Sequence, residues 1–279
     1  MNRNPTPRLL AVLAHPDDES LGVGGTLAKY AAEGVDVFLL TATRGDAGRF
    51  RGHRPGSTEH PGAVALGEIR EKELRAAAAT LGVRETTVLA YPDSQLDRAN
   101  PREVIANIAG HMRRIRPDVV LTFAPDGAYG HPDHVAISQF TTAATVAAAD
   151  PGFAHDDVVV AGPPHAVSKL YFNAWPASLW TAYQATIGQL VSVVDGIERQ
   201  ATPWPDWSIT TAIDTRHVWS TVWQAVSCHE SQVAAYKGLA DLSPEHHQVI
   251  WGSQWFYRAF STVNGGRARE TDLFEGIRG

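Results

Sequence analysis

The first 150 residues alternate between two kinds of segment, and this alternation constrains the fold most strongly. Short apolar runs, typical of buried strands, are followed by longer segments rich in helix-forming residues. The expected strands cover residues 8–14, 35–42, 86–91 and 117–124, and the expected helices cover residues 21–34, 64–82, 101–116 and 133–149. Strands that alternate with helices at this spacing predict right-handed βαβ crossovers. We therefore expect an α/β fold with a Rossmann-like, doubly wound and mainly parallel sheet.

The second half of the chain carries a weaker pattern. One clear strand is expected at residues 168–173 and a helix at 215–240, whereas residues 249–263 fit a helix or a strand. The sequence shows no repeat and no low-complexity linker between the halves. The expected organisation is a single domain over residues 1–279, with a core in residues 1–150 and a C-terminal elaboration in residues 151–279.

Charge and apolar patterning argue against several classes of partner. The 24 Lys and Arg residues and 30 Asp and Glu residues give a net charge of −6, whereas a general nucleic-acid surface needs a basic face. A membrane-spanning helix needs about 18 or more consecutive apolar residues, and the chain contains no such run. We expect a cytoplasmic protein without nucleic-acid or membrane partners. Its aromatic-rich C-terminal part is compatible with a homo-oligomer.

Two motifs rich in histidine and aspartate follow two of the expected strands. "AHPDDE" at residues 14–19 follows the first strand, and "GHPDH" at residues 130–134 follows the fourth. In a parallel sheet the carboxyl ends of all strands lie at one edge, where ligand sites form. Adjacent carboxylates repel one another, so three in a row after His15 indicate a nearby positive charge. We therefore expect the two motifs to meet around a metal ion.

The residue types suit a catalytic metal. Zn²⁺ accepts imidazole nitrogen and carboxylate oxygen, and a catalytic zinc site uses three protein ligands and leaves one position open. His15, Asp18 and His134 supply such a set, and Asp17 remains beside it, where a general base belongs. We expect one Zn²⁺ per chain, with Fe²⁺ or another divalent ion as the alternative. Helix capping by Asp17, Asp18 or Asp133 is a competing interpretation, but it does not explain the histidines.

These motifs resemble those of the LmbE-like (PIG-L) family of zinc-dependent N-acetylglucosaminyl deacetylases, and they are similar to its mycothiol-type deacetylases and amidases. "TRGDAG" at 43–48 resembles the family's Thr-x-Gly-Glu-x-Gly loop, with Asp46 in place of the glutamate. "YPDSQL" at 91–96 and "CHESQ" at 228–232 also resemble family segments. The resemblance spans roughly residues 8 to 235.

The resemblance implies a role for each matching residue. The implied zinc ligands are His15, Asp18 and His134, and the implied catalytic residues are Asp17, Tyr129, His131 and Asp133. In this scheme Asp17 activates the attacking water and Tyr129 helps to hold the developing oxyanion. His131, oriented by Asp133, stabilises the tetrahedral intermediate or protonates the leaving amine. Asp93 and Arg49 fall where the mycothiol-type members contact sugar hydroxyls.

The expected function is therefore metal-dependent hydrolysis of a linear amide, most simply deacetylation of an N-acetylglucosaminyl-type or other N-acetylated small substrate. One alternative is a nucleotide-binding Rossmann-type protein without hydrolytic activity. The glycines of "LGVGG" at 21–25 lack the Gly-x-Gly-x-x-Gly spacing of such proteins and instead predict close packing of a helix on the sheet. A second alternative is a zinc-binding structural module, which would need four protein ligands.

Overall fold

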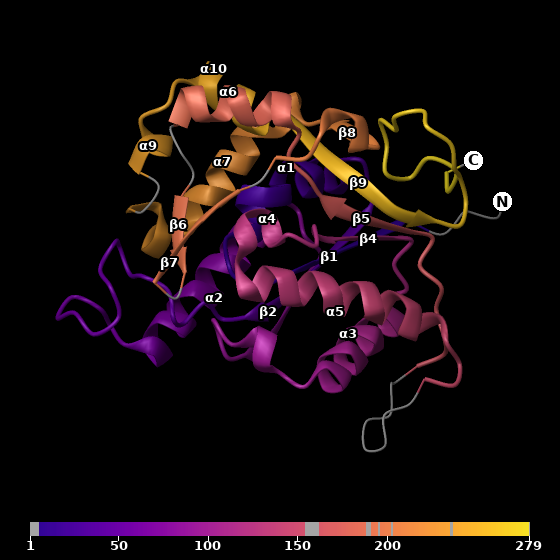
Figure 1. Cartoon of the computed structure of the whole chain (residues 1–279), viewed down its shortest axis with the longest axis horizontal. Helices are drawn as coiled ribbons and strands as arrows, with labels where there is room; N and C mark the ends of the chain where they lie inside the picture. The colour runs from indigo at the N-terminus through magenta and orange to yellow at the C-terminus, as the bar shows by residue number, and fades with distance from the viewer. Residues whose placement is uncertain are drawn as a thin grey trace.

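A computed structural model describes residues 6–153, 162–187, 191–194, 196–201, 203–234 and 237–278. Strands and helices alternate through the first part of the chain (Figure 1). In order, these elements are β1 (Arg8–Leu13), α1 (Asp18–Ala32), β2 (Asp36–Thr43), α2 (Ala63–Thr80), β3 (Glu85–Tyr91), α3 (Pro101–Ile115), β4 (Val119–Phe123), α4 (Gly127–Gly130), α5 (Pro132–Ala149) and β5 (Lys169–Asn173). Each core strand and helix expected from the sequence is present, with its ends within three residues of the prediction.

The second part of the chain contains shorter elements. They are α6 (Ala177–Ile187), β6 (Val191–Val194), β7 (Ile197–Gln200), β8 (Thr211–Asp214), α7 (Trp219–Cys228), α8 (Glu230–Val233), α9 (Lys237–Ala240), α10 (Pro244–Trp251) and β9 (Ser253–Ser261). The short 3₁₀ turns η2 (Asp206–Ser208) and η3 (Arg216–Val218) lie on either side of β8, and a third, η1 (Leu96–Arg98), lies between β3 and α3 in the first part of the chain. Strands β6 and β7 pair antiparallel as a separate hairpin.

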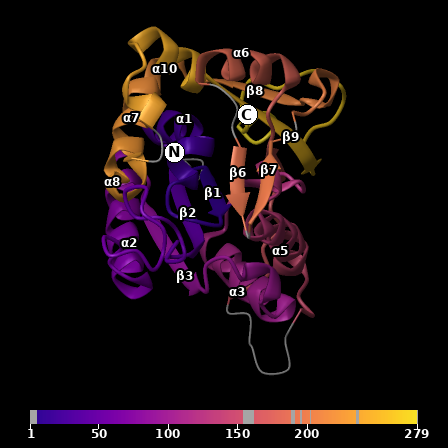
Figure 2. The ribbon, with the colours of Figure 1, turned by 60° about the vertical axis from the view of Figure 1, so that its left-hand side comes forward.

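Seven strands form one sheet in the order β3-β2-β1-β4-β5-β9-β8. The pairs among β1 to β5 are parallel, whereas β9 runs antiparallel to β5 and to β8. Helices α1, α2 and α7 lie on one side of the sheet and α3 and α5 on the other (Figure 2). The expected α/β fold with a doubly wound, mainly parallel sheet is confirmed.

Burial explains why the central strands read as continuous apolar runs. All five residues of β4 and of β5 are buried, as are five of the six residues of β1. Strands of a parallel sheet are covered by helices on both faces and therefore favour apolar side chains along most of their length. The outer strand β3 is only half-buried along most of its length, and its sequence is correspondingly more polar.

Two expectations for the C-terminal half need correction. The helix expected at 215–240 is broken into η3, α7, α8 and α9, with residues 235 and 236 outside the described part. The break after α7 falls at His229, whose φ of −83° and ψ of 56° are not helical. Residues 249–263 contain both predicted alternatives, because α10 ends at Trp251 and β9 begins at Ser253.

The glycines of α1 make the expected contact with the sheet at one position and other contacts at two. A Cβ atom at Gly22 would lie 3.2 Å from Asn173 Nδ2 on β5. A Cβ atom at Gly25 would lie 2.8 Å from the Thr215 Cβ atom, and one at Gly24 would lie 3.3 Å from Val222 Cγ1. Both neighbours belong to the C-terminal half of the chain. Gly24 and Gly25 therefore let α1 approach α7 and the residue before η3 closely, whereas Gly22 lies against the sheet.

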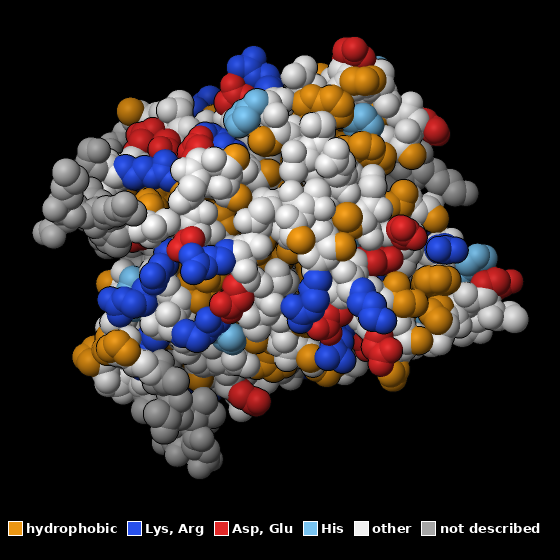
Figure 3. Space-filling view, turned by 180° about the vertical axis from the view of Figure 1, so that it is seen from behind, with side chains coloured by type: hydrophobic (Ala, Val, Ile, Leu, Met, Phe, Trp, Pro, Cys, Tyr) orange, Lys and Arg blue, Asp and Glu red, His pale blue; other side chains and the backbone are white. Residues whose placement is uncertain are grey.

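Surface charge and helix character are the two structural features relevant to nucleic-acid and membrane partners. On the face shown in Figure 3, Lys and Arg side chains lie interspersed with Asp and Glu side chains. Within the described part of the chain, no helix has the length and apolar character needed to cross a bilayer.

Candidate metal centre and active site

The turn after β1 presents the first motif. Asp17 takes the left-handed conformation, with φ 103°, and its carbonyl accepts hydrogen bonds from the Ser20 and Leu21 N–H groups, which starts α1. Helix α1 begins at Asp18 rather than at residue 21, so the acidic residues occupy its first turn, where the helix dipole favours negative charge. The His15 N–H donates to Asp18 Oδ2 at 2.7 Å and closes the turn.

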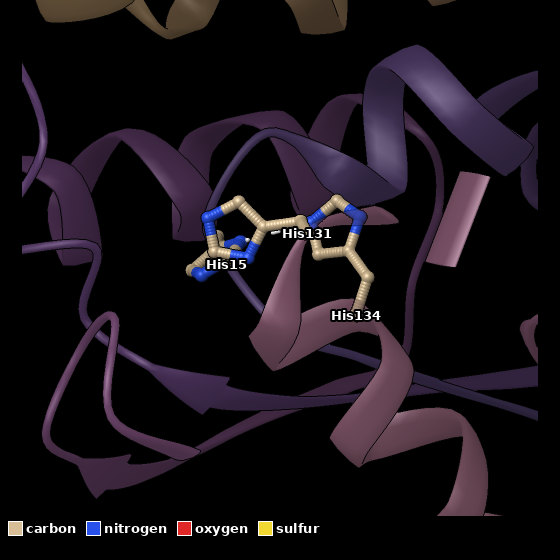
Figure 4. A group of neighbouring side chains, drawn as sticks. All are labelled: His15, His131 and His134. Carbon is tan, nitrogen blue, oxygen red and sulfur yellow. Dashed lines mark hydrogen bonds between the residues drawn. The ribbon is translucent and has the colours of Figure 1, made fainter. Parts of the chain in front are cut away.

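The second motif lies between β4 and α5. His131 is the N-cap of α5, and its Nδ1 accepts a hydrogen bond from the Asp133 N–H at 3.2 Å. His134 lies in the first turn of α5, where its ring stacks on Phe123 with centroids 4.0 Å apart. The imidazoles of His15, His131 and His134 come together from the two motifs (Figure 4).

The three expected metal ligands lie close together. His15 Nδ1 is 3.1 Å from His134 Nε2, and the Asp18 carboxylate oxygens lie 3.6 Å from His15 Nδ1 and 3.5 Å from His134 Nε2. A tetrahedral zinc site with metal–ligand distances of about 2.0–2.1 Å places its ligand atoms about 3.3 Å apart. These separations therefore suit a tetrahedral ion. His131 also offers a ring nitrogen to the same cluster, so His15, His131 and His134 form a second candidate set.

The other hydrogen bonds of the two rings leave the two facing nitrogens in a position that suits a positive charge between them. His15 Nε2 lies 3.1 Å from carboxylate oxygens of both Asp93 and Asp133, and His134 Nδ1 lies 3.2 Å from the Gly127 carbonyl oxygen. These acceptors assign the protons to His15 Nε2 and His134 Nδ1, as partners of metal-binding histidines commonly do. If both rings are neutral, the facing nitrogens, His15 Nδ1 and His134 Nε2, both present lone pairs. Two lone pairs 3.1 Å apart repel, and either a metal ion between them or a second proton on His15 Nδ1 removes the repulsion.

The pKa values of the cluster residues show that the carboxylates stabilise a positive charge near His15. Burial alone would lower the pKa of His15, but hydrogen bonds to Asp133 and Asp93 and the Asp18 charge raise it to about 10. Burial and the nearby His15 and His131 hold the pKa of His134 well below its usual range. Burial raises the pKa of Asp18 to about 7. Without a metal, the carboxylates therefore keep protons on both ring nitrogens of His15, and its Nδ1–H donates to His134 Nε2.

Arg70 is a site residue that sequence reasoning missed. Its guanidinium is buried, with Nη2 3.1 Å from Asp17 Oδ2 and Nη1 donating to the Gly45 carbonyl at 2.8 Å. A Cβ atom at Gly45 or Gly48 would lie 2.2 or 2.8 Å from Arg70 Nη1. The glycines of the "TRGDAG" loop therefore make room for the Arg70 side chain. They are the one sequence feature that could have indicated a large side chain packed against this loop.

The two outer carboxylates, Asp133 and Asp93, differ from the expectation. The Asp133 carboxylate contacts His15 Nε2 and also accepts from the Ser94 N–H at 2.7 Å. The contact between Asp133 and His131 is made by the backbone N–H of Asp133 and not by its carboxylate. Asp93 accepts from the Ala47 N–H at 2.8 Å through its second oxygen. Because Asp93 is buried between His15 and this loop, the geometry favours orientation of His15 over contact with a sugar.

Tyr129 and Arg49 lie at the outer side of the cluster. The Tyr129 ring centroid is 5.2 Å from that of His134 and 6.0 Å from that of His131. Burial and the charges of Asp18 and Asp17 raise the pKa of Tyr129 above its usual value, so its hydroxyl stays protonated and can donate. Arg49 is exposed, and its carbonyl oxygen accepts from Gln232 Nε2 at 2.8 Å. Its contact with substrate stays a prediction.

Comparison with known sequences gives a consistent set of relatives. Residues 10–145 match the model of the GlcNAc-PI de-N-acetylase (PIG-L) family. A 1D-myo-inositol 2-acetamido-2-deoxy-α-D-glucopyranoside deacetylase from Rhodococcus jostii is 35% identical over 294 residues, which cover 97% of this chain and 98% of that protein. This relative, which matches nearly the whole of this chain, is a deacetylase by name.

Solved structures show the same fold. A conserved protein from Thermus thermophilus matches with a TM-score of 0.62 and 26% identity, covering 94% of this chain and 98% of that one. A 4-carboxy-2-hydroxymuconate hydratase from Pseudomonas putida matches with a TM-score of 0.66 at 19% identity, covering 94% and 100%. Since a hydratase shares the architecture, the fold alone does not determine the chemistry.

Proposed function

Because the chain belongs to the GlcNAc-PI de-N-acetylase (PIG-L) family, we propose that it is a divalent-metal-dependent hydrolase that removes the acetyl group from an N-acetylglucosaminyl compound. The observation that carries this proposal is the close approach of His15 Nδ1, His134 Nε2 and the Asp18 carboxylate, at the separations that a tetrahedral ion requires. Two histidines and one carboxylate leave a tetrahedral ion one open position, as hydrolytic zinc sites do.

His15, Asp18 and His134 would hold the ion, with Zn²⁺ as the first candidate. When bound, such an ion supplies a Lewis acid and lowers the pKa of water to about 7. A closed structural site is disfavoured, because it would need a fourth protein ligand. His131 is the nearest candidate for that fourth ligand. Its Nδ1 accepts the Asp133 N–H, so only its other ring nitrogen remains for a ligand or a substrate.

The chain's own residues provide the proton transfers of amide hydrolysis. Asp17 would accept a proton from the attacking water, held in place by Arg70. The protonated hydroxyl of Tyr129 would donate to the developing oxyanion. Because His131 Nδ1 accepts the Asp133 N–H, Nε2 carries the single ring proton and would donate a hydrogen bond that stabilises the tetrahedral intermediate. The proton that Asp17 takes from water would then pass to the leaving amine nitrogen. The products are acetate and the free amine.

The name of the Rhodococcus jostii relative suggests the substrate. We propose N-acetylglucosamine linked to inositol as the substrate, with the exposed Arg49 side chain available for its hydroxyl groups. Specificity for the inositol part would come from the loop at residues 44–62 and from the C-terminal half.

The experiment measures acetate release from N-acetylglucosaminyl-inositol and from free N-acetylglucosamine by purified protein of known metal content. We expect one divalent ion per chain, acetate release that stops when the ion is chelated, and recovery when Zn²⁺ or Fe²⁺ is restored. Faster turnover of the inositol conjugate would support the proposed specificity. Acetate release that survives complete removal of the metal would refute the metal-dependent mechanism, and no release from any N-acetylated sugar would refute the deacetylase itself.

A further inference from the structure

His229 is a buried histidine that the mechanism above does not use. It lies at the break between α7 and α8, with 1% of its surface exposed. Its Nε2 lies 2.7 Å from Oε1 of Glu19, which is completely buried in the first turn of α1. The two residues are 210 positions apart in the sequence, so this contact joins the C-terminal half to the first motif.

Glu19 in turn holds the backbone of Asp17. Glu19 Oε2 accepts the Asp17 N–H at 3.0 Å, and Oε1 also accepts the Ser20 hydroxyl. Asp17 needs this support because its φ of 103° is strained for a residue with a side chain. Strained conformations persist only where the surroundings fix them, and Glu19 fixes the one backbone donor of Asp17.

We propose that His229 is a positioning residue that fixes the general base Asp17 through Glu19. The inference rests on the proposed function for the role of Asp17. In this arrangement Asp17 is held from two directions, because Arg70 contacts its carboxylate while Glu19 and His229 hold its backbone. The orientation of the base then depends on a residue from the C-terminal half of the chain.

The segment that carries His229 is itself anchored firmly. The Ser231 N–H and hydroxyl donate to the two oxygens of the Glu73 carboxylate at 2.7 and 2.6 Å. The Ser231 carbonyl accepts the Arg51 N–H at 2.7 Å. Glu73 lies on α2, one turn after Arg70. The same helix thus carries one contact to Asp17 and anchors the segment that supplies the other.

A purely structural role explains the pair less well. Burying an ion pair gives little net stability, because desolvation offsets the attraction between the charges. His229 Nδ1 is also buried and has no hydrogen-bond partner among the described residues, which adds a further cost. A site selected for packing alone would favour an apolar residue here. A donor aimed at Glu19 is what positioning requires.

The test compares His229→Ala with His229→Gln, whose side-chain amide can still donate to Glu19. For His229→Ala we expect kcat to fall by about tenfold or more, while KM changes less than about twofold and the metal content stays at one ion per chain. His229→Gln is expected to restore most of kcat. His247→Ala is the matched control, since His247 is a buried histidine of the C-terminal half that stacks on Trp219 and Trp251. It should lower the melting temperature but leave kcat unchanged.

Two further measurements identify the route of the effect. Glu19→Gln should also lower kcat. Combining it with His229→Ala should cause little further loss of kcat, because both variants break the same series of contacts from His229 through Glu19 to Asp17. Hydrogen exchange needs no substrate and separates this inference from the proposed function. The Asp17 amide should exchange faster in metal-loaded His229→Ala than in the wild-type protein, but not in His247→Ala.

Several outcomes would overturn the inference. These are an unchanged kcat in folded His229→Ala, additive losses in the double variant, and loss of the metal in step with activity. Unchanged exchange at Asp17 would also overturn it, whether or not the protein proves to be a deacetylase. If Asp17 exchange changes as expected but the wild-type protein releases no acetate, only the proposed function fails.

Discussion

Asp17 and Asp18 are adjacent carboxylates with different surroundings, and this difference separates proton transfer from metal binding. Asp18 approaches both facing histidine nitrogens, whereas Asp17 pairs with Arg70. We expect Asp17→Asn to keep one metal ion per chain and to lower kcat by about 10²–10⁴-fold, the usual loss for a general base. Asp18→Ala should instead lose the ion. Metal analysis and acetate release measured on the same samples check both variants.

The outcome that would contradict this assignment is equally clear. If Asp17→Asn lost the metal, or if Asp18→Ala kept it at full affinity, the two roles would have to be exchanged. Reduced folding is excluded by comparing the melting temperatures of both variants in excess metal.

At the residue scale, the sequence predicted the candidate metal ligands but not the residues that hold Asp17 in place. The motif residues His15, Asp18 and His134 are recognisable because histidine and aspartate are rare together at strand ends, and a parallel sheet brings such ends to one edge. Arg70 lies on α2 and His229 lies between α7 and α8, and the sequence pattern of neither segment distinguishes a buried cation or imidazole from an exposed one. Their partners are 53 and 210 residues away, and only the folded chain shows those contacts.

Among the elements, the antiparallel strands at one end of the sheet are held by a buried carboxylate. Glu270 is 2% exposed and accepts hydrogen bonds at 2.7 Å from Lys169 and Tyr171 on β5, Thr211 on β8 and Arg258 on β9. One side chain thus connects three neighbouring strands. Burial alone would raise its pKa, but these donors, led by Lys169, lower it from 4.5 to about 2.

This shift predicts how stability depends on pH. Because the folded-state pKa of Glu270 is lowered, its contribution is complete above pH 4.5 and is lost as the pH falls from 4.5 towards 2. A shift of this size corresponds to about 3 kcal/mol. We expect Glu270→Gln to lose about 3 kcal/mol of unfolding free energy at pH 7, because Lys169 is left buried without its counter-charge. The difference from wild type should narrow below pH 4.5.

Urea unfolding at pH 7, 5, 4 and 3 measures this difference directly. The control is Glu59→Gln, since Glu59 has a side chain 59% exposed and a surface charge of that kind contributes little. A stability difference for Glu270→Gln that stayed constant down to pH 3 would contradict the argument.

Element boundaries were predictable in the core and not in the C-terminal half. Between β1 and α5, apolar runs and helical periodicity indicate the elements, and residues that end helices mark their boundaries. One such residue is Gly34, which takes a positive φ of 82° after α1. In residues 215–240 the helical pattern is continuous in sequence, yet the chain breaks at His229. Tertiary contacts to Glu19 and Glu73 override the local preference for a helix there, and such contacts cannot be predicted from residue propensities.

At the scale of the molecule, the C-terminal half is not an appendage to the core. Strand β5 pairs with β4 of the core and β9 pairs with β5, so the sheet continues from one half of the chain into the other. Helix α7 covers α1 through the buried residue Val222, next to Gly24. The sequence pattern favoured one domain because it contains no linker, and the shared sheet gives that expectation a physical reason.

A shared sheet predicts that the two halves unfold together. The eight tryptophans all lie between residues 175 and 255, so their fluorescence reports on the C-terminal half alone, whereas far-ultraviolet circular dichroism reports on the helices and strands of both halves. We expect the two signals to change at the same urea concentration, as in a two-state transition. A fragment ending at residue 150 should not fold, because it exposes the β4 edge that pairs with β5 and leaves α1 without α7. Fluorescence that changed at a distinctly lower urea concentration, together with a folded fragment, would show that residues 1–150 form a domain of their own.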